Sequence, residues 1–168
     1  MTTLDNFWSQ IIDQAIKNAD IDGRENVAEF LRLRSKNDAI RQTAVTWLLD
    51  TFTSEIMTTE SISRGLVVER VDTHHFKHEN SNLIGSHLSF QLGVRCLSVE
   101  AGWTRTPSDG IMTGGALARA RISHFGFARA KEEFLLILEQ PRPRWRQSET
   151  AAFFDTSILT HHLDLLIA

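Results

Sequence analysis

Residues 87–103, HLSFQLGVRCLSVEAGW, decide the fold class of this chain. In their first half every second residue is apolar: Leu88, Phe90, Leu92, Val94 and Cys96. A period of two predicts a β-strand with one buried face. The alternation continues from Leu97 to Trp103 in the opposite parity, so it slips by one residue at Cys96–Leu97. We interpret this slip as a β-bulge within one long strand.

Further strand patterns surround this stretch and predict a sheet part over residues 65–146. Residues 66–76 form a first strand, and residues 116–123 alternate in the same way as a later one. The segment TPSDG, residues 106–110, has the turn chemistry of a hairpin. The run 133–140 is strand-like, although the residues just before it favour helix. Together these patterns predict a mainly antiparallel sheet of four or five strands.

The N-terminal part of the chain carries a helical pattern instead. Eight apolar residues recur there at helical spacing: Leu4, Phe7, Trp8, Ile11, Ile12, Ala15, Ile16 and Ala19. A second helix opens at Asp22, where Glu25 completes a capping box. The polar run Ser35–Asp38 offers a stop and a new N-cap, so a third helix continues to about Met57. We therefore expect about three N-terminal helices.

The C-terminal element has two possible structures. Ser148 can cap a helix, whereas residues 162–167 alone also suit a strand, and we expect the helix. The resulting fold class is α+β, with the helices covering one face of the sheet. We expect a single domain over residues 1–168. Its three parts are a helical part at 1–57, a sheet part at 65–146 and a C-terminal element at 148–168.

The composition is that of an ordinary folded domain. Apolar residues make up 42% of the chain and charged residues 23%, which argues against disorder. The longest run of large apolar residues, Phe134–Leu138, is far shorter than the roughly 20 residues that span a bilayer, so we expect no membrane partner. No secretory signal is visible, and the single cysteine, Cys96, cannot form an internal disulfide. These features predict a cytoplasmic protein.

A group of charged side chains on neighbouring predicted strands is the first candidate site. Its members are Arg95, Glu100, Arg105, Arg119 and Arg121. The planar guanidinium group suits bidentate contacts with carboxylate or phosphate. We therefore expect a non-catalytic module that binds a small anionic molecule or a protein partner through this face. The alternative is an ordinary solvated face whose ion pairs each contribute roughly 0.2–1 kcal/mol.

Three histidines, His74, His75 and His78, form the second candidate site. Converging imidazoles bind zinc or a similar divalent metal, which would make the chain a metal-dependent or hydrolase-like enzyme. No CxxC or HExxH pattern supports this alternative, and the histidines can equally decorate a strand end and its loop. Without such a metal we expect no cofactor. Cys96 with His124 as a nucleophile and base is an alternative to a buried thiol.

Two basic segments raise weak nucleic-acid binding as a further alternative. Residues 141–146, PRPRWR, interleave arginines with a tryptophan, a combination that contacts phosphates and stacks on bases. Four cations flank the predicted turn between the second and third helices, as in a helix-turn-helix: Arg32, Arg34, Lys36 and Arg41. With a net charge of −3, a surface edge that arginine and proline protect from pairing is the alternative for residues 141–146, and acidic surroundings argue against the helix-turn-helix. Four tryptophans and the apolar stripes also permit a homodimer.

Overall fold

The computed structural model describes residues 3–57, 65–139 and 142–168, and the side-chain surroundings of all of these except 3–9 and 12. The chain divides into two compact units, Met1–Gln42 and Thr43–Ala168. The first contains helix α1 and the beginning of helix α2. The second contains the rest of α2, the sheet and the C-terminal helix.

Two helices form the N-terminal part, α1 (Thr3–Ile21) and α2 (Glu25–Met57). The prediction of a break at Ser35–Asp38, and hence of three helices, is wrong. Residues 25–57 contain neither glycine nor proline, and Asp38 pairs with Arg41 one turn later at 2.7 Å instead of capping a new helix. One helix of 33 residues therefore replaces the second and third predicted ones.

The sheet has six strands in the order β1-β2-β3-β4-β5-β6, and every neighbouring pair is antiparallel. This confirms the α+β class and the antiparallel sheet, with more strands than the four or five predicted. The strands are β1 (Val67–His78), β2 (Ser81–Leu92), β3 (Arg95–Trp103), β4 (Ala118–His124), β5 (Glu132–Glu139) and β6 (Arg142–Gln147).

A hairpin turn, not a β-bulge, causes the slip in residues 87–103. β2 ends at Leu92, β3 begins at Arg95, and these two residues pair across a two-residue turn. Gly93 takes the positive φ of 61° that such a turn requires. Reversal of the chain places Leu88 opposite Val99 on the same face, which produces the change of parity. The missed turn accounts for one strand beyond the four predicted segments, and β6, which pairs with β5, is the other.

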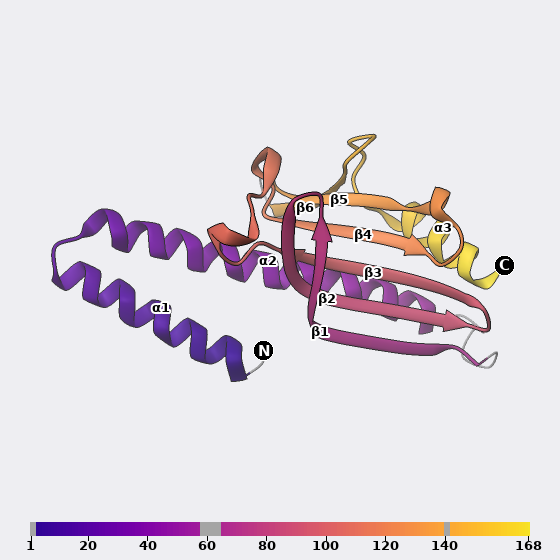
Figure 1. Ribbon diagram of the computed structural model, residues 1–168, viewed down its shortest axis with the longest axis horizontal. Coiled ribbons are helices and arrows are strands. Elements are labelled where there is room, and N and C mark those ends of the chain that lie inside the picture. The colour runs from indigo at the N-terminus through magenta and orange to yellow at the C-terminus, as the bar shows by residue number, and fades with distance from the viewer. Residues whose placement is uncertain (1–2, 58–64, 140–141) are drawn as a thin grey trace. The chain divides into compact units, whose positions relative to one another are not determined.

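The core of the second unit lies between one face of the sheet and two helical segments, the part of α2 from residue 43 and α3 (Thr156–Ile167) (Figure 1). Trp145 of β6 donates its indole N–H to the carbonyl of Ala44 in α2 over 3.2 Å. Asp155, not Ser148, caps α3 by accepting from the amides of Ser157 and Ile158. The largest fully buried side chains come from both layers: Leu48, Leu49, Phe52, Ile56, Leu83, Leu88, Phe90, Leu97, Ile122, Phe134, Leu136 and Leu166.

The other face of the sheet, here called the outer face, is crossed by the tip of the β1–β2 hairpin, which bends over β3 and β4 (Figure 1). Two paired glycines permit the bend. A Cβ atom on Gly85 would lie 1.9 Å from the carbonyl oxygen of Ala101, and one on Gly102 would lie 2.7 Å from that of Ile84. Among the helices that the structure describes, none combines the length and the apolar character needed to cross a bilayer.

Candidate functional site

The outer face carries a row of charged residues because alternate side chains of a strand point to opposite faces. Ladder pairing sets His87 beside Glu100, Glu100 beside Arg121 and Arg121 beside Glu133. Arg119 lies two residues before Arg121 on the same face of β4. The bent tip of the hairpin brings two more polar residues, His74 and His78, over this row. We call these seven residues the outer-face cluster.

Glu100 lies at the centre of the outer-face cluster. Its Oε1 accepts a hydrogen bond from Nε2 of His74 over 2.7 Å, and its Oε2 accepts from Nε of Arg121 over 2.9 Å and from a second guanidinium nitrogen. Its side chain is only 15% exposed. Burial raises the pKa of Glu100, but the hydrogen bonds from His74 and Arg121 more than offset this, so the pKa lies below its ordinary value. The carboxylate therefore stays ionised and neutralises Arg121.

Aromatic rings pack around this ion pair. The ring of His74 stacks on that of His87 with centroids 4.8 Å apart, and on that of Phe76 at 5.7 Å. The guanidinium of Arg121 lies 5.7 Å from the centre of the Phe76 ring. Burial and the neighbouring His74 lower the pKa of His87, which keeps that imidazole neutral at pH 7. The stack thus fixes the hairpin tip over the sheet.

Arg119 differs from Arg121 in the chemistry of its partners. Its Nη1 donates to Nε2 of His78 over 2.6 Å, and its Nη2 donates to Oγ1 of Thr113 over 2.6 Å. Both acceptors are uncharged. Burial and the positive charge of Arg119 lower the pKa of His78, which keeps it neutral at pH 7. Within the described part of the chain, no carboxylate forms an ion pair with Arg119.

A second carboxylate, Glu133, lies behind His78. Its Oε2 is 3.6 Å from Nδ1 of His78, and its Oε1 forms an ion pair with Lys131 at 2.7 Å. Burial raises the pKa of Glu133, but the hydrogen bond from Lys131 and the charge of His78 outweigh it and leave the pKa lowered. Arg121 in the cluster and Lys131 beside it therefore both have anionic partners, whereas Arg119 forms no ion pair with a described carboxylate.

Three of the predicted site residues lie outside the outer-face cluster. Arg95 is exposed at the start of β3, at the opposite end of that strand from the hairpin tip. Arg105 stacks on Trp103 with its guanidinium carbon 3.8 Å from the ring centre, and donates to the Ile84 carbonyl at 3.4 Å. His75 points away from the outer face because it alternates with His74 along β1.

Some members of the site escaped the sequence analysis. Glu133 and His87 follow from register, since each lies directly across a strand pair from a predicted residue. The sequence therefore predicts these two positions only when the strand pairing is already known. Thr113 comes from a loop, where no periodicity predicts where a side chain points.

The three histidines do not converge. His74 is bonded to Glu100, His78 to Arg119, and His75 lies on the other side of β1. In the part of the chain that the structure describes, no group of three or more histidine, cysteine, aspartate or glutamate residues is arranged to hold a metal ion.

The structure gives no support to the cysteine–histidine pair or to the two basic segments as functional sites. Cys96 has its Sγ 4.0 Å from Oγ of Ser98, whereas His124 bonds to His162, so the proposed nucleophile and base have separate partners. In the basic segment 141–146, whose first residue is not described, Trp145 is 3% exposed and its ring is not available to stack on a base. The predicted turn of a helix-turn-helix lies inside the continuous helix α2.

Comparison with known proteins finds no matching family model, no matching curated protein and no matching solved structure.

Proposed function

We propose that this chain is a non-catalytic module that binds a small anionic ligand at the outer-face cluster, with Arg119 as the main contact. The observation that carries the proposal is the pair of uncharged acceptors, His78 and Thr113, on a half-buried guanidinium. A guanidinium bonds a carboxylate or phosphate more strongly than it bonds a neutral acceptor. An anion that replaces Thr113 would therefore gain a charge-assisted contact.

The neighbours of Arg119 support this assignment. Arg121 holds Glu100 through two hydrogen bonds and serves as a fixed wall of the site. His78 can add to the positive charge, because a protonated imidazole would turn from accepting from Arg119 to donating to the ligand. Its Nδ1 faces Glu133, which would stabilise the protonated form. We therefore expect anion binding to tighten as the pH falls through the lowered pKa of His78.

The alternative of a metal-dependent or hydrolase-like enzyme has less support. It needs converging ligands, or a nucleophile next to a base. Nε2 of His74 and Nε2 of His78 instead have protein partners, and His75 lies apart from them. Cys96 is a free thiol, which suits the reducing compartment, the cytoplasm, that we propose for the chain.

Isothermal titration calorimetry of the whole chain with inorganic phosphate and with succinate, at low ionic strength, tests the proposal. We expect at least one of these anions to bind, and Arg119→Gln to weaken that binding about tenfold or more, since a charge-assisted hydrogen bond contributes roughly 1.5–3 kcal/mol.

The matched control is Arg95→Gln, which removes the same charge from an exposed position on β3 outside the cluster. It should change the affinity less than about twofold. Equal losses in the two variants would mean that only the overall charge attracts the anion. Absence of binding by either anion at millimolar concentration, at pH 6 as well as at pH 8, would refute the proposal.

A further inference from the structure

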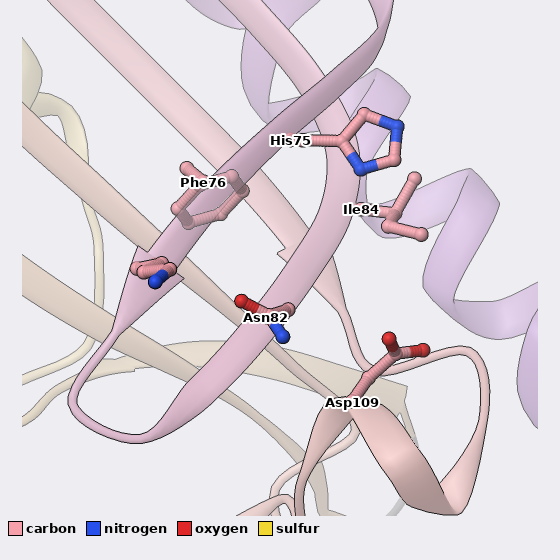
Figure 2. A pocket seen from close by; sticks show the side chains of 6 residues that line it. His75, Phe76, Asn82, Ile84 and Asp109 are labelled. Carbon is pink, nitrogen blue, oxygen red and sulfur yellow. The ribbon is translucent and has the colours of Figure 1, made fainter.

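A second site lies on the reverse side of the same hairpin tip. An open pocket of about 340 Å³ is lined by His75, Phe76, Lys77, Asn82, Ile84 and Asp109 (Figure 2). This volume falls in the range of small-ligand pockets. Ladder pairing explains the wall that belongs to the hairpin: His75 pairs with Ile84, and Lys77 pairs with Asn82, so all four side chains point to one side. The outer-face cluster uses the alternate residues and lies on the other side.

The opposite wall is the loop that carries Asp109, and a close backbone contact positions it. Gly110 has a φ of 112°, and a Cβ atom there would lie 2.4 Å from Oγ of Ser81 in the hairpin tip. Glycine thus lets the loop approach the hairpin. The 3₁₀ turn Pro107–Asp109 then directs the Asp109 carboxylate toward the pocket, next to Asn82 and Ile84 (Figure 2).

Asp109 is held in an ionised and oriented state. Its Oδ2 accepts from the backbone amide of Thr106 over 2.9 Å and from the hydroxyl of Thr106 over 2.9 Å. These hydrogen bonds lower the pKa of Asp109. Because both end on Oδ2, the Oδ1 atom can accept from a ligand.

The pocket contains opposite charges that do not neutralise each other. Among the described residues, neither Lys77 nor Asp109 forms an ion pair; Thr106 is the main hydrogen-bond donor to Asp109, with smaller contributions from the Arg105 backbone and the charge of His75. A ligand between the two walls would therefore face an ammonium on the hairpin and a carboxylate on the loop. Two further polar groups, of His75 and Asn82, and the apolar side chain of Ile84 complete the lining.

We propose that this pocket binds a free amino acid with a small aliphatic side chain. The ligand's α-ammonium group would donate to Oδ1 of Asp109, and its α-carboxylate would accept from Lys77 and from the amide of Asn82. Its side chain would lie against Ile84. A molecule with one charge would leave one of the two charged walls without a partner, so the site selects for a zwitterion.

Calorimetric titration of the whole chain with three probes tests this inference. L-Leucine carries both charges, 3-methylbutylamine lacks the carboxylate, and 4-methylpentanoate lacks the ammonium. We expect L-leucine to bind, and each truncated probe to bind about tenfold or more weakly, because each loses one charge-assisted contact.

Two variants on opposite walls, Asp109→Asn and Lys77→Gln, should each weaken L-leucine binding about tenfold or more. In Asp109→Asn the side-chain amide oxygen can still accept from Thr106, so the loop keeps its anchor. Asp72→Asn, which changes an exposed carboxylate on the same strand as Lys77, is the matched control and should leave the affinity within about twofold.

The pocket and the outer-face cluster are tested separately. Arg119→Gln should leave L-leucine binding unchanged, and a loss in that variant would assign the amino acid to the outer face and overturn this inference. Equal affinity for L-leucine and 3-methylbutylamine would overturn it too. So would the absence of binding by L-leucine, L-valine and L-alanine at millimolar concentration, whatever the result with phosphate or succinate.

Discussion

Nε2 of His124 at the end of β4 and Nδ1 of His162 in α3 share a hydrogen bond of 3.0 Å. The rings stack with centroids 5.3 Å apart, and the side chain of His162 is fully buried. Nε2 of His162 has no hydrogen-bond partner among the described residues, and the nearest carboxylate oxygen, Oε1 of Glu132, is 3.6 Å away. The imidazole pair therefore connects α3 to the sheet in its neutral form.

This pair makes the stability of the fold depend on pH. Burial lowers the pKa of His162 to about 4, with His124 and His161 contributing to the shift. The unfolded chain therefore binds a proton that the folded chain excludes between about pH 6.5 and pH 4, and the free energy of unfolding falls as the pH falls through this window. We expect a loss of at most about 3 kcal/mol from His162. Urea unfolding followed by tryptophan fluorescence at several pH values measures it.

Two neighbours modify this pH profile. Burial also lowers the pKa of His124, which adds to the loss at acid pH. Burial raises the pKa of Glu132, so the folded chain gains a proton there as the pH falls, which offsets part of the loss. His162→Gln should flatten the profile, whereas His161→Gln, on the exposed side of α3, should reduce its steepness only slightly, because His161 is the smallest of the causes that lower the pKa of His162. A wild-type profile that is flat from pH 7 to pH 4.5 would contradict the buried neutral pair.

Removing the central carboxylate of the outer-face cluster should destabilise the chain. In Glu100→Gln the partially buried Arg121 loses its anionic partner, and the acceptor of the His74 hydrogen bond is no longer charged. We expect a loss of about 1–3 kcal/mol, less than for a fully buried pair because solvent reaches the site. Glu139→Gln is the control, since its pair with Arg144 is half exposed at 3.9 Å and should change stability by less than about 0.5 kcal/mol. Urea unfolding measures both losses. Equal losses in the free energy of unfolding would show that the Glu100–Arg121 ion pair stabilises the fold no more than an exposed pair does.

Much of the fold could be predicted from local pattern. The period of two in β3 and the helical spacing in α1 indicated the correct element types, because each depends on which face of one segment is buried. The turn at Gly93 was missed because its neighbours Leu92, Val94 and Arg95 fit a continuous alternation. A two-residue turn and a β-bulge both shift the alternation of apolar residues by one position. Only the pairing of residues between strands distinguishes the two.

The site shows the same division between local and long-range information. Five charged residues on neighbouring strands were predicted to form one site: Arg95, Glu100, Arg105, Arg119 and Arg121. Glu100, Arg119 and Arg121 do share a face, whereas Arg95 and Arg105 lie elsewhere. The contacts of His74 with Glu100 and of His78 with Arg119 were not predicted, because they require the β1–β2 hairpin to bend over the sheet. The bend depends on the close approach of two backbone segments at Gly85 and Gly102, and the spacing of apolar side chains does not predict such a contact.

The bend itself is open to test at Gly85. In Gly85→Ala the new Cβ would meet the carbonyl oxygen of Ala101 at 1.9 Å, a contact that only a backbone shift relieves. We expect a loss of several kcal/mol in stability, or failure to fold. Gly93→Ala is the control: its φ is 61°, no atom lies within 4 Å of the new Cβ, and the cost should stay near the roughly 1–2 kcal/mol of a left-handed alanine. Equal melting temperatures of the two variants would show that β2 does not bend tightly over β3 at this position.

The indole of Trp145 joins the last strand of the sheet to α2, so Trp145→Phe should weaken the contact between the two layers. The variant loses the hydrogen bond to the Ala44 carbonyl and leaves space in the core, which together cost about 2 kcal/mol. Trp47→Phe is the matched control, because Trp47 is 52% exposed and makes an edge contact with Phe154 that phenylalanine can partly retain. Guanidinium unfolding of both variants measures the difference. A larger loss of unfolding free energy in Trp47→Phe than in Trp145→Phe would mean that the buried contact between α2 and β6 does not stabilise the fold as expected.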